Sequence, residues 1–463
     1  MKLIHKFRQN GNNFLLDVNS GSVHVVDDIV YDVLDYYKER SLDEIINTLK
    51  QHREEDIRTA YLELQELEEK ELLYSEDIFP ESQTFKGRDP IVKAMCLHMA
   101  HDCNLSCKYC FAGQGEFNGP KGLMPFEVGK RAIDYLIANS KNRRNLEIDF
   151  FGGEPLMNFG VVKELVEYGD QEAKKHNKVF RFTITTNGIL LDDEKIEYIN
   201  KHMHNVVLSL DGRKEINDAM RPTINGRGSY DIIVPKFQKL VEGRGDKYYY
   251  IRGTFTRNNM DFGKDVLHYR DLGFELTSME PVVDHEQNEY ALRSEDIEKV
   301  NREYEEFAKE YLEIRKHDPR FKFFHYMIDL SGGPCAIKRI SGCGAGIEYL
   351  AITPDGDIFP CHQFVGKERF RLGNLFDQEI SFPKHIVDEF LATDVTTKDD
   401  CKICWAKFYC SGGCHANAYN FNADIKKPYK DGCEMQKKRI ECAIMVEAML
   451  KLNEMSEGES DVG

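Results

Sequence analysis

Three cysteines stand close together in the first quarter of the chain, in a pattern that suits an iron–sulfur cluster. Cys103, Cys107 and Cys110 have the spacing C-x3-C-x2-C directly after an apolar segment. Three thiolates on one short loop can bind three irons of a cubane [4Fe–4S] cluster, which leaves the fourth iron open to a small chelating molecule. Zinc is the alternative, and it would need a fourth protein ligand such as His98 or His101.

A second and larger group of cysteines lies toward the C-terminus. Cys343 is followed by twelve residues and Gly356, and then by four residues and Cys361. The other members have the spacing C-x2-C-x5-C-x3-C, with a last cysteine after eighteen more residues: Cys401, Cys404, Cys410, Cys414 and Cys433. A zinc ribbon is the alternative for the C-x2-C pair. However, seven cysteines do not divide into the sets of four that structural zinc takes.

The segment around the first cysteine loop alternates strands and helices, which predicts a parallel sheet, either open or closed into a barrel. The expected strands are 92–98, 146–151, 180–186, 206–210, 248–256 and 274–281. The expected helices between them include 126–139, 160–176 and 192–202. Several of these strands end in polar or glycine-rich turns. In such folds the carboxyl ends of the strands carry the site.

Composition divides the rest of the chain. Residues 1–80 contain no cysteine, and strands at 14–18 and 22–26 followed by helices predict a small winged-helix unit. The barrel is assigned to 91–320. Residues 331–442 are rich in glycine and cysteine, and bound metals can stabilise a domain with so weak an apolar pattern. The last segment, 443–463, is expected to be a tail that is polar and disordered from Ser456 onwards.

Charge and cysteine content limit the environment and the partners. The formal net charge is -17, which disfavours a nucleic-acid partner. The 13 cysteines and the absence of an export signal favour metal ligands over disulfides and predict a cytoplasmic protein. No apolar run approaches the ~20 residues that span a membrane. Cys96 and Cys442 lie in a strand-like and a helical segment, and we expect both to be small buried apolar residues.

The first cysteine loop, with Tyr109 before its third cysteine, resembles that of the radical S-adenosylmethionine superfamily. The resemblance implies a partial (β/α)6 barrel. It also implies that the amino and carboxylate groups of S-adenosylmethionine chelate the open iron. Electron transfer then gives a 5′-deoxyadenosyl radical, which abstracts hydrogen from the substrate.

Further motifs resemble those of the superfamily in the same order. Gly152-Gly153-Glu154-Pro155 is similar to the turn that binds the methionine amino group, where Glu154 would add negative charge. Arg221, twelve residues after Ser209, resembles the arginine that pairs with the methionine carboxylate. Taken singly, such turns are common. The cofactor contacts implied are Tyr109, Gly152, Gly153, Glu154, Thr185, Asn187, Ser209, Asp211, Arg221 and Glu280.

The second cysteine group resembles the SPASM extension, which binds two auxiliary [4Fe–4S] clusters. The resemblance assigns Cys343, Cys361 and Cys414 to the first auxiliary cluster. It assigns a second set to the other cluster: Cys401, Cys404, Cys410 and Cys433. Together with the radical cluster this implies three [4Fe–4S] clusters. Cys335 either completes the first auxiliary cluster or leaves there an iron open to a substrate thiolate.

The whole chain, with the stretches 343–352 and 359–366, resembles the maturases of SCIFF peptides. These are thioether synthases of the sactionine and ranthipeptide type, which join a cysteine sulfur of a precursor to a carbon of another residue. The likeness implies that residues 1–80 bind a leader peptide. The peptide would add as an extra strand to the edge of the hairpin formed by 14–18 and 22–26. It also implies an electron donor such as flavodoxin or ferredoxin.

Other functions remain open on the sequence alone. A sulfatase-maturing type of enzyme would oxidise cysteine or serine to formylglycine, and another SPASM peptide modification is equally an enzyme hypothesis. A non-catalytic electron-transfer or sensor protein is the third class. The ordered motifs from Gly152 to Arg221 argue against that class, because a protein that only carries electrons has no need of a S-adenosylmethionine site.

Overall fold

The chain begins with a small three-stranded sheet and three helices. The structure is a computed structural model that describes residues 4–77, 91–331 and 340–460, so Cys335 lies outside the described residues. The strands are antiparallel in the order β1 (Ile4–Gln9), β2 (Asn12–Asp17) and β3 (Val23–Val26). The helices that follow are α1 (Asp28–Val33), α2 (Leu42–Thr48) and α3 (Glu54–Glu69).

One strand of this sheet differs from the sequence prediction. We expected an exposed hairpin at 14–18 and 22–26, but β1 pairs with β2, which is therefore the central strand. Of the two predicted strands, only β3 lies at an edge of the sheet, and no described strand pairs with its outer side. Phe14, Leu15 and Leu16 are fully buried, as befits a strand covered on both faces. The β1 sequence has few apolar residues, and for this reason its periodicity gave no strand signal.

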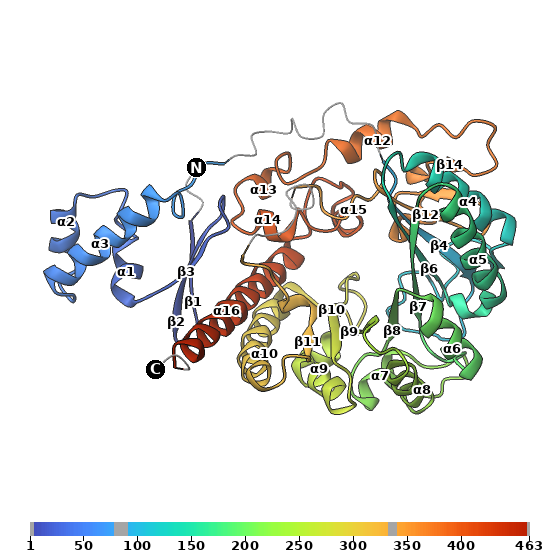
Figure 1. The fold of residues 1–463 in the computed structure, drawn as a ribbon, viewed down its shortest axis with the longest axis horizontal. Helices are drawn as coiled ribbons and strands as arrows, with labels where there is room; N and C mark the ends of the chain where they lie inside the picture. The colour runs from blue at the N-terminus through green and yellow to red at the C-terminus, as the bar shows by residue number, and fades with distance from the viewer. Residues whose placement is uncertain (1–3, 78–90, 332–339, 461–463) are drawn as a thin grey trace.

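Six parallel strands form the middle of the molecule, each within three residues of its predicted segment. They are neighbours in chain order: β4 (Ala94–His101), β6 (Asn145–Gly152), β7 (Val179–Thr186), β8 (Asn205–Ser209), β9 (Tyr248–Phe255) and β10 (Leu276–Pro281). The connecting helices lie on the outer side of the curved sheet (Figure 1). They include α4 (Phe126–Asn139), α5 (Phe159–Lys175), α6 (Asp193–His202), α8 (Tyr230–Glu242) and α9 (Phe262–Asp271).

The sheet does not close on itself. At one side β10 pairs with the short β11 (Lys322–Phe323), and at the other side β4 pairs with β12 (Tyr349–Ile352). Between these ends the hydrogen-bonded path is continuous, and the described strands β11 and β14 (Gly373–Asn374) do not pair with each other. The predicted partial (β/α)6 barrel is therefore confirmed.

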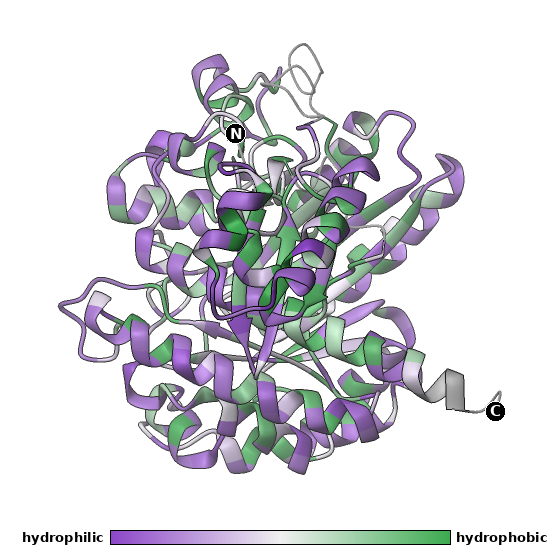
Figure 2. Ribbon diagram, turned by 90° about the vertical axis from the view of Figure 1, so that its left-hand side faces the viewer, coloured by the Kyte–Doolittle hydropathy of each residue, from purple (hydrophilic) through white to green (hydrophobic). Residues whose placement is uncertain are grey.

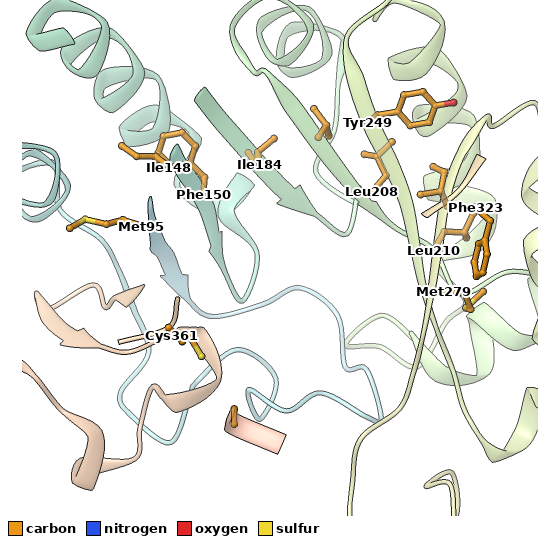
Figure 3. Close-up of a cluster of buried hydrophobic side chains, with 14 of the residues drawn as sticks. Met95, Ile148, Phe150, Ile184, Leu208, Leu210, Tyr249, Met279, Phe323 and Cys361 are labelled. Carbon is orange, nitrogen blue, oxygen red and sulfur yellow. The ribbon is translucent and has the colours of Figure 1, made fainter. Parts of the chain in front are cut away.

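The core lies between the strands and the outer helices. Ile148, Ile184 and Leu208 are buried and come from the adjacent strands β6, β7 and β8 (Figure 3). Apolar residues concentrate on the central strands, while polar residues mark the surrounding helices (Figure 2). Burial alternates along β6, β7 and β8, so every second side chain faces the interior of the barrel. These inward positions are the ones that can form a site.

The cysteine-rich region continues the barrel sheet. β12 runs parallel to β4, and β13 (Asp357–Phe359) returns antiparallel to it after a turn in which Gly356 has φ +90°. Short helices follow, namely α12 (Lys384–Leu391), α13 (Asp399–Lys402), α14 (Lys407–Cys410) and α15 (His415–Asn422). The chain ends in a long helix, α16 (Lys430–Ser460).

The expected C-terminal tail at 443–463 differs from the structure. Through Ser460 these residues belong to α16, which packs beside α10 (Ile297–His317) (Figure 1). Cys442, Ile444 and Met445 are buried on this helix. The polar residues near the end suggested disorder, but the buried apolar residues before them hold the helix in place. Among the described residues, no helix is both long and apolar enough to span a bilayer.

The N-terminal sheet is packed against the cysteine-rich region. The His5 ring stacks on Trp405 with ring centroids 3.7 Å apart, and its Nε2 lies 2.8 Å from a carboxylate oxygen of Glu441 on α16. Gln9 donates a hydrogen bond to the sulfur of Cys442. Phe7 belongs to the same apolar cluster as the barrel core. Deleting the sheet would therefore expose apolar surface elsewhere in the protein.

Candidate active site

A cavity of about 620 Å³ lies between the carboxyl ends of the parallel strands and the cysteine-rich region. Its wall includes the three cysteines of the first loop and three cysteines of the second group: Cys103, Cys107, Cys110, Cys410, Cys414 and Cys433. Nine of the ten predicted cofactor contacts also line it, and Asp211 is the exception. One cavity therefore faces both cysteine groups.

The first cysteine loop is fixed by main-chain hydrogen bonds to a distant segment. The N–H of Ser106 donates to the carbonyl of Pro222, and that of Lys108 donates to the carbonyl of Met220. Arg221 lies between these two acceptors. The bonds hold the loop and the predicted carboxylate-binding arginine in one frame, although more than a hundred residues separate them in sequence.

The Gly-Gly-Glu turn is packed directly onto the entry to the cysteine loop. Gly153 N–H donates to the Ala100 carbonyl at 2.8 Å, and Glu154 N–H donates to the Asp102 carbonyl at 3.0 Å. A Cβ atom on Gly153 would lie 2.0 Å from the Asp102 carbonyl oxygen. Gly152 has φ +116°, which side chains rarely tolerate. Glycine is required here because two main-chain segments approach each other so closely.

Glu154 is held by hydrogen bonds within the protein, at a position where it also lines the cavity. Its carboxylate is fully buried and accepts hydrogen bonds from the main-chain N–H groups of Leu156 and Asn187 and from the Thr186 hydroxyl. Burial raises the pKa of Glu154 to about 7, although these donors act in the opposite direction. The side chain joins the 152–155 turn to the 185–188 turn. Its carboxylate therefore has protein donors already, and the additional contact with a ligand ammonium stays a prediction.

Tyr109, Asp211 and Arg221 form a hydrogen-bonded chain beside the cysteine loop. Tyr109 donates to the Asp211 carboxylate, and Arg221 donates to the Tyr109 hydroxyl at 2.8 Å. Asp211 is fully buried behind them and also accepts from Thr254 N–H. Within the described residues the Nε of Arg221 has no partner although it is buried. Asp211 therefore positions the other two, and Arg221 keeps a donor for a carboxylate.

The remaining predicted contacts come from the ends of three strands, β7, β8 and β10. Thr185 and Ser209 line the cavity, and Asn187 donates to the side-chain oxygen of Asn104 at 2.8 Å. Glu280 also lines the cavity, but its carboxylate accepts from Arg439 of α16 at 3.2 Å. Burial opposes ionisation of Glu280, yet neighbouring positive charges hold its pKa at about 2. This ion pair links the last barrel strand to the cysteine-rich region.

Electrostatic interactions among the cysteines of the second group follow the two predicted sets. Burial raises the pKa of Cys361 to about 12, and the nearby Cys414 and Cys343 raise it further. Burial likewise raises the pKa of Cys433 to about 12, with added effects of the other set members Cys410, Cys401 and Cys404. Bound iron would supply the positive charge that buried thiolates need.

The donor arrangement suits clusters better than single ions. Within the described residues, no group of three His, Cys, Asp or Glu side chains could hold one metal ion. His98 and His101, the possible fourth zinc ligands, instead contact each other at 3.1 Å and pack against Phe117. A cubane spreads its thiolates over separate iron corners, so its ligands need not converge on one point. Cys96 and Cys442 are completely buried, as expected.

Several cavity residues were missed from the sequence. Arg252 on β9 is exposed to the cavity, and its guanidinium makes no hydrogen bond or ion pair with any described residue. Thr254 lines the same wall, while Ile251 and Phe255, the neighbours that flank this pair on the strand, are buried. The period of two along this strand could have identified both inward residues. No sequence period identifies Arg439 as a cavity residue, because α16 reaches the cavity only by packing against elements that are distant in the sequence.

Family models match the two regions that carry the cysteines. The model of the radical SAM superfamily matches residues 97–257. The model of the SPASM iron–sulfur cluster-binding domain matches residues 343–405. These segments contain the first cysteine loop and the start of the second group.

Relatives with curated names cover most of the chain. The cysteine-type anaerobic sulfatase-maturating enzyme of Clostridium novyi is 25% identical over 335 residues, which are 68% of this chain and 86% of that protein. The subtilosin biosynthesis protein AlbA of Bacillus subtilis is 26% identical over 342 residues, 71% of this chain and 68% of AlbA. A match of 37% to the uncharacterized protein MJ0907 of Methanocaldococcus jannaschii spans 30% of this chain and only 45% of that relative.

A solved structure shares the fold over nearly the whole chain. Streptococcus suis SuiB bound to the precursor peptide SuiA has a TM-score of 0.54 and 17% identity, and the match covers 92% of this chain and 97% of SuiB. The fold and the cysteine site thus define a radical SAM enzyme with a SPASM domain. This chain is a homologue of the anaerobic sulfatase-maturating enzymes and of the subtilosin maturase AlbA.

Proposed function

We propose that this enzyme forms a thioether between a cysteine sulfur and a carbon of another residue in a cysteine-rich precursor peptide. The observation that carries the proposal is the single cavity lined by both cysteine groups. A peptide held there would lie between the radical-generating loop and the auxiliary cysteines. The fold of SuiB, which matches 92% of this chain and is solved with a bound precursor peptide, supports a peptide substrate. Similarity to SCIFF maturases in particular remains a prediction.

The residues divide into those that hold cofactors and those that position them. Cys103, Cys107 and Cys110 would bind the first [4Fe–4S] cluster, and the two sets of the second group would bind two auxiliary clusters. With S-adenosylmethionine bound, a cluster held there would supply the 5′-deoxyadenosyl radical chemistry that takes hydrogen from a substrate. Arg221, oriented by Tyr109 and Asp211, binds the cofactor carboxylate. The turn at 152–155 supplies main-chain groups for the ammonium of the same cofactor.

Formylglycine formation is the competing function, and the named relatives support it equally. The two reactions differ in what happens to the cysteine sulfur. A thioether keeps the sulfur and removes two hydrogen atoms per crosslink, whereas oxidation of cysteine to formylglycine removes the sulfur and leaves an aldehyde. Oxidation of serine also removes two hydrogens, but it leaves every cysteine thiol free.

Mass spectrometry of a co-expressed precursor peptide should separate these outcomes. We expect loss of two hydrogens per crosslink, with the same number of cysteines protected from alkylation. A hydrazide probe for aldehydes should not react. Fragmentation should place the linked cysteine and its partner in one unbroken loop. Loss of sulfur or labelling by the hydrazide would instead establish formylglycine formation.

The open edge of β3 is the proposed binding site for the leader of the precursor. The N–H of Asp17 donates to the Ser22 carbonyl, so these two residues form a hydrogen-bonded pair between the strands. Along an antiparallel ladder, hydrogen-bonded residue pairs alternate with pairs that are not hydrogen-bonded to each other. Val23 and Val25, which face Leu16 and Phe14 on β2, therefore direct their N–H and carbonyl groups away from β2. A peptide could add there as a fourth strand.

Replacing Val25 by proline should weaken precursor binding about five- to tenfold, the effect of losing one hydrogen bond of ~1 kcal/mol. Proline removes the outward N–H and keeps an apolar side chain. Val25→Thr keeps the N–H and the branched shape, so it serves as the matched control. Fluorescence anisotropy with a labelled precursor measures the affinity, and production of 5′-deoxyadenosine without peptide should be unchanged in both variants. Equal affinity in V25P and wild type would exclude this edge.

The other partner and the location stay predictions. Reduction of the clusters requires an electron donor, for which flavodoxin or ferredoxin is proposed. A cytoplasmic location is the environment in which exposed cluster cysteines remain reduced.

A further inference from the structure

A buried lysine lies between the two sets of auxiliary cysteines. Lys398 is 1% exposed, and its main-chain carbonyl accepts from the N–H of Cys401 at the start of α13. Its Nζ reaches the segment after α14 and donates to the Gly412 carbonyl at 2.8 Å. Gly412 lies midway between Cys410 and Cys414. The side chain therefore spans from one cluster-binding segment to the next.

The charge of this lysine has no carboxylate beside it. Within the described residues, Lys398 makes no ion pair, whereas the exposed Lys402 nearby pairs with Asp399 at 3.3 Å. Burial disfavours the charged amine, whereas four nearby thiol groups favour it: Cys401, Cys410, Cys414 and Cys433. Three of these belong to the second auxiliary set and one to the first.

A buried cation without a carboxylate is costly unless another negative charge offsets it. A [4Fe–4S] cluster with thiolate ligands carries net negative charge, and reduction adds one more electron. Cluster potentials depend on net charge, hydrogen bonds and exposure. A fixed positive charge nearby favours the reduced form and so raises the potential.

We propose that Lys398 sets the reduction potential of the auxiliary clusters, chiefly that of the second cluster, as the positive charge shared by both sets. The inference rests on the proposed auxiliary cluster sites. Lys398 binds no iron and touches no substrate. Its effect is to make the reduced cluster more stable, so that an electron entering or leaving the cavity through these clusters meets a less negative potential.

The test uses the full chain in a background that lacks the first cluster, Cys103→Ala, Cys107→Ala and Cys110→Ala, so that only auxiliary clusters contribute. Lys398→Met removes the charge, and Lys398→Gln removes it but keeps a donor for Gly412. Lys398→Arg keeps the charge. Lys402→Met is the matched control, because Lys402 lies four residues further along the chain and is exposed to solvent. Iron content is measured first, and dithionite titrations followed by paramagnetic resonance give the midpoint potentials.

We expect the reduced-to-oxidised ratio at fixed potential to fall about tenfold in both neutral variants, equivalent to about 59 mV for one electron. K398R and K402M should stay near the unsubstituted background. An unchanged potential in K398Q or K398M with full iron content would overturn the proposal. Loss of iron in both neutral variants would also overturn it, because Lys398 would then be a structural residue. Absence of auxiliary iron in the background itself would instead refute the proposed cluster sites.

Discussion

Replacing Cys103, Cys107 and Cys110 together by alanine should abolish reductive cleavage of S-adenosylmethionine. All three side chains line the cavity, and no thiolates would remain there to hold the cluster that cleaves the cofactor. Production of 5′-deoxyadenosine should fall to the background of an assay without enzyme. Iron bound by the second cysteine group should be retained, because those residues lie on other elements.

Cys96→Ala is the matched control for this experiment. Cys96 is completely buried on β4, seven residues before the loop; it packs with Ala112 and Phe117 and is not among the residues that line the cavity. The variant should lose stability modestly, since only one sulfur atom is removed from the core, and should keep cofactor cleavage. If the triple variant still made 5′-deoxyadenosine, the first loop would not be the radical site. Loss of cleavage in Cys96→Ala would point to folding rather than chemistry.

Local patterns carried much of the fold and part of the site. The six barrel strands follow from apolar segments of strand length that alternate with helical ones, because each element is encoded by its own few residues. The hairpin around Gly356 likewise follows from a local turn. Cysteine spacing identified both groups, since ligands of one cluster must come from short loops or from segments that the fold brings together.

What the sequence concealed depends on contacts between distant segments. Glu154 is acidic and sits in a ligand-binding turn, so a ligand charge was the natural expectation; only the positions of Thr186 and Asn187 show that its carboxylate joins two turns. Asp211 follows a strand end like the cavity residues, yet Tyr109 covers it. Lys398 is one lysine among many until Gly412 is seen beside its amine. None of these pairings has a sequence period.

The fold explains why the two cysteine groups can act on one substrate. β12 extends the barrel sheet beside β4, the strand that leads into the first cysteine loop. At the opposite side, Arg439 of α16 bonds Glu280 on β10. The cysteine-rich region is thus attached to both ends of the open barrel and covers its mouth. In the proposed function, a peptide held in this cavity would lie beside the wall that contains Cys410, Cys414 and Cys433.

Gly153→Ala should lower cofactor cleavage by about 100-fold or more, the effect that a displacement of ~1 Å can have on a site that depends on orientation. The new Cβ would lie 2.0 Å from the carbonyl oxygen of Asp102 and 2.6 Å from its carbonyl carbon, and both are main-chain atoms that cannot rotate away. The turn must therefore move from the entry to the cysteine loop. This also strains the hydrogen bond from Glu154 N–H to the same carbonyl.

Gly160→Ala separates this steric effect from the general effect of adding a methyl group. Gly160 lies in α5, seven residues further on, and a Cβ there would meet no atom within 4 Å. Because alanine is favoured over glycine in a helix by ~1 kcal/mol, this variant should be at least as stable as wild type and fully active.

Calorimetric binding of S-adenosylmethionine, 5′-deoxyadenosine production and iron content should be measured for both. Gly153→Ala should keep its auxiliary iron while it loses cofactor binding, because the clash acts only between β4 and β6. Wild-type binding in Gly153→Ala would show that the cofactor does not depend on the contact between this turn and the cysteine loop, and the proposed cofactor site would have to be placed elsewhere in the cavity.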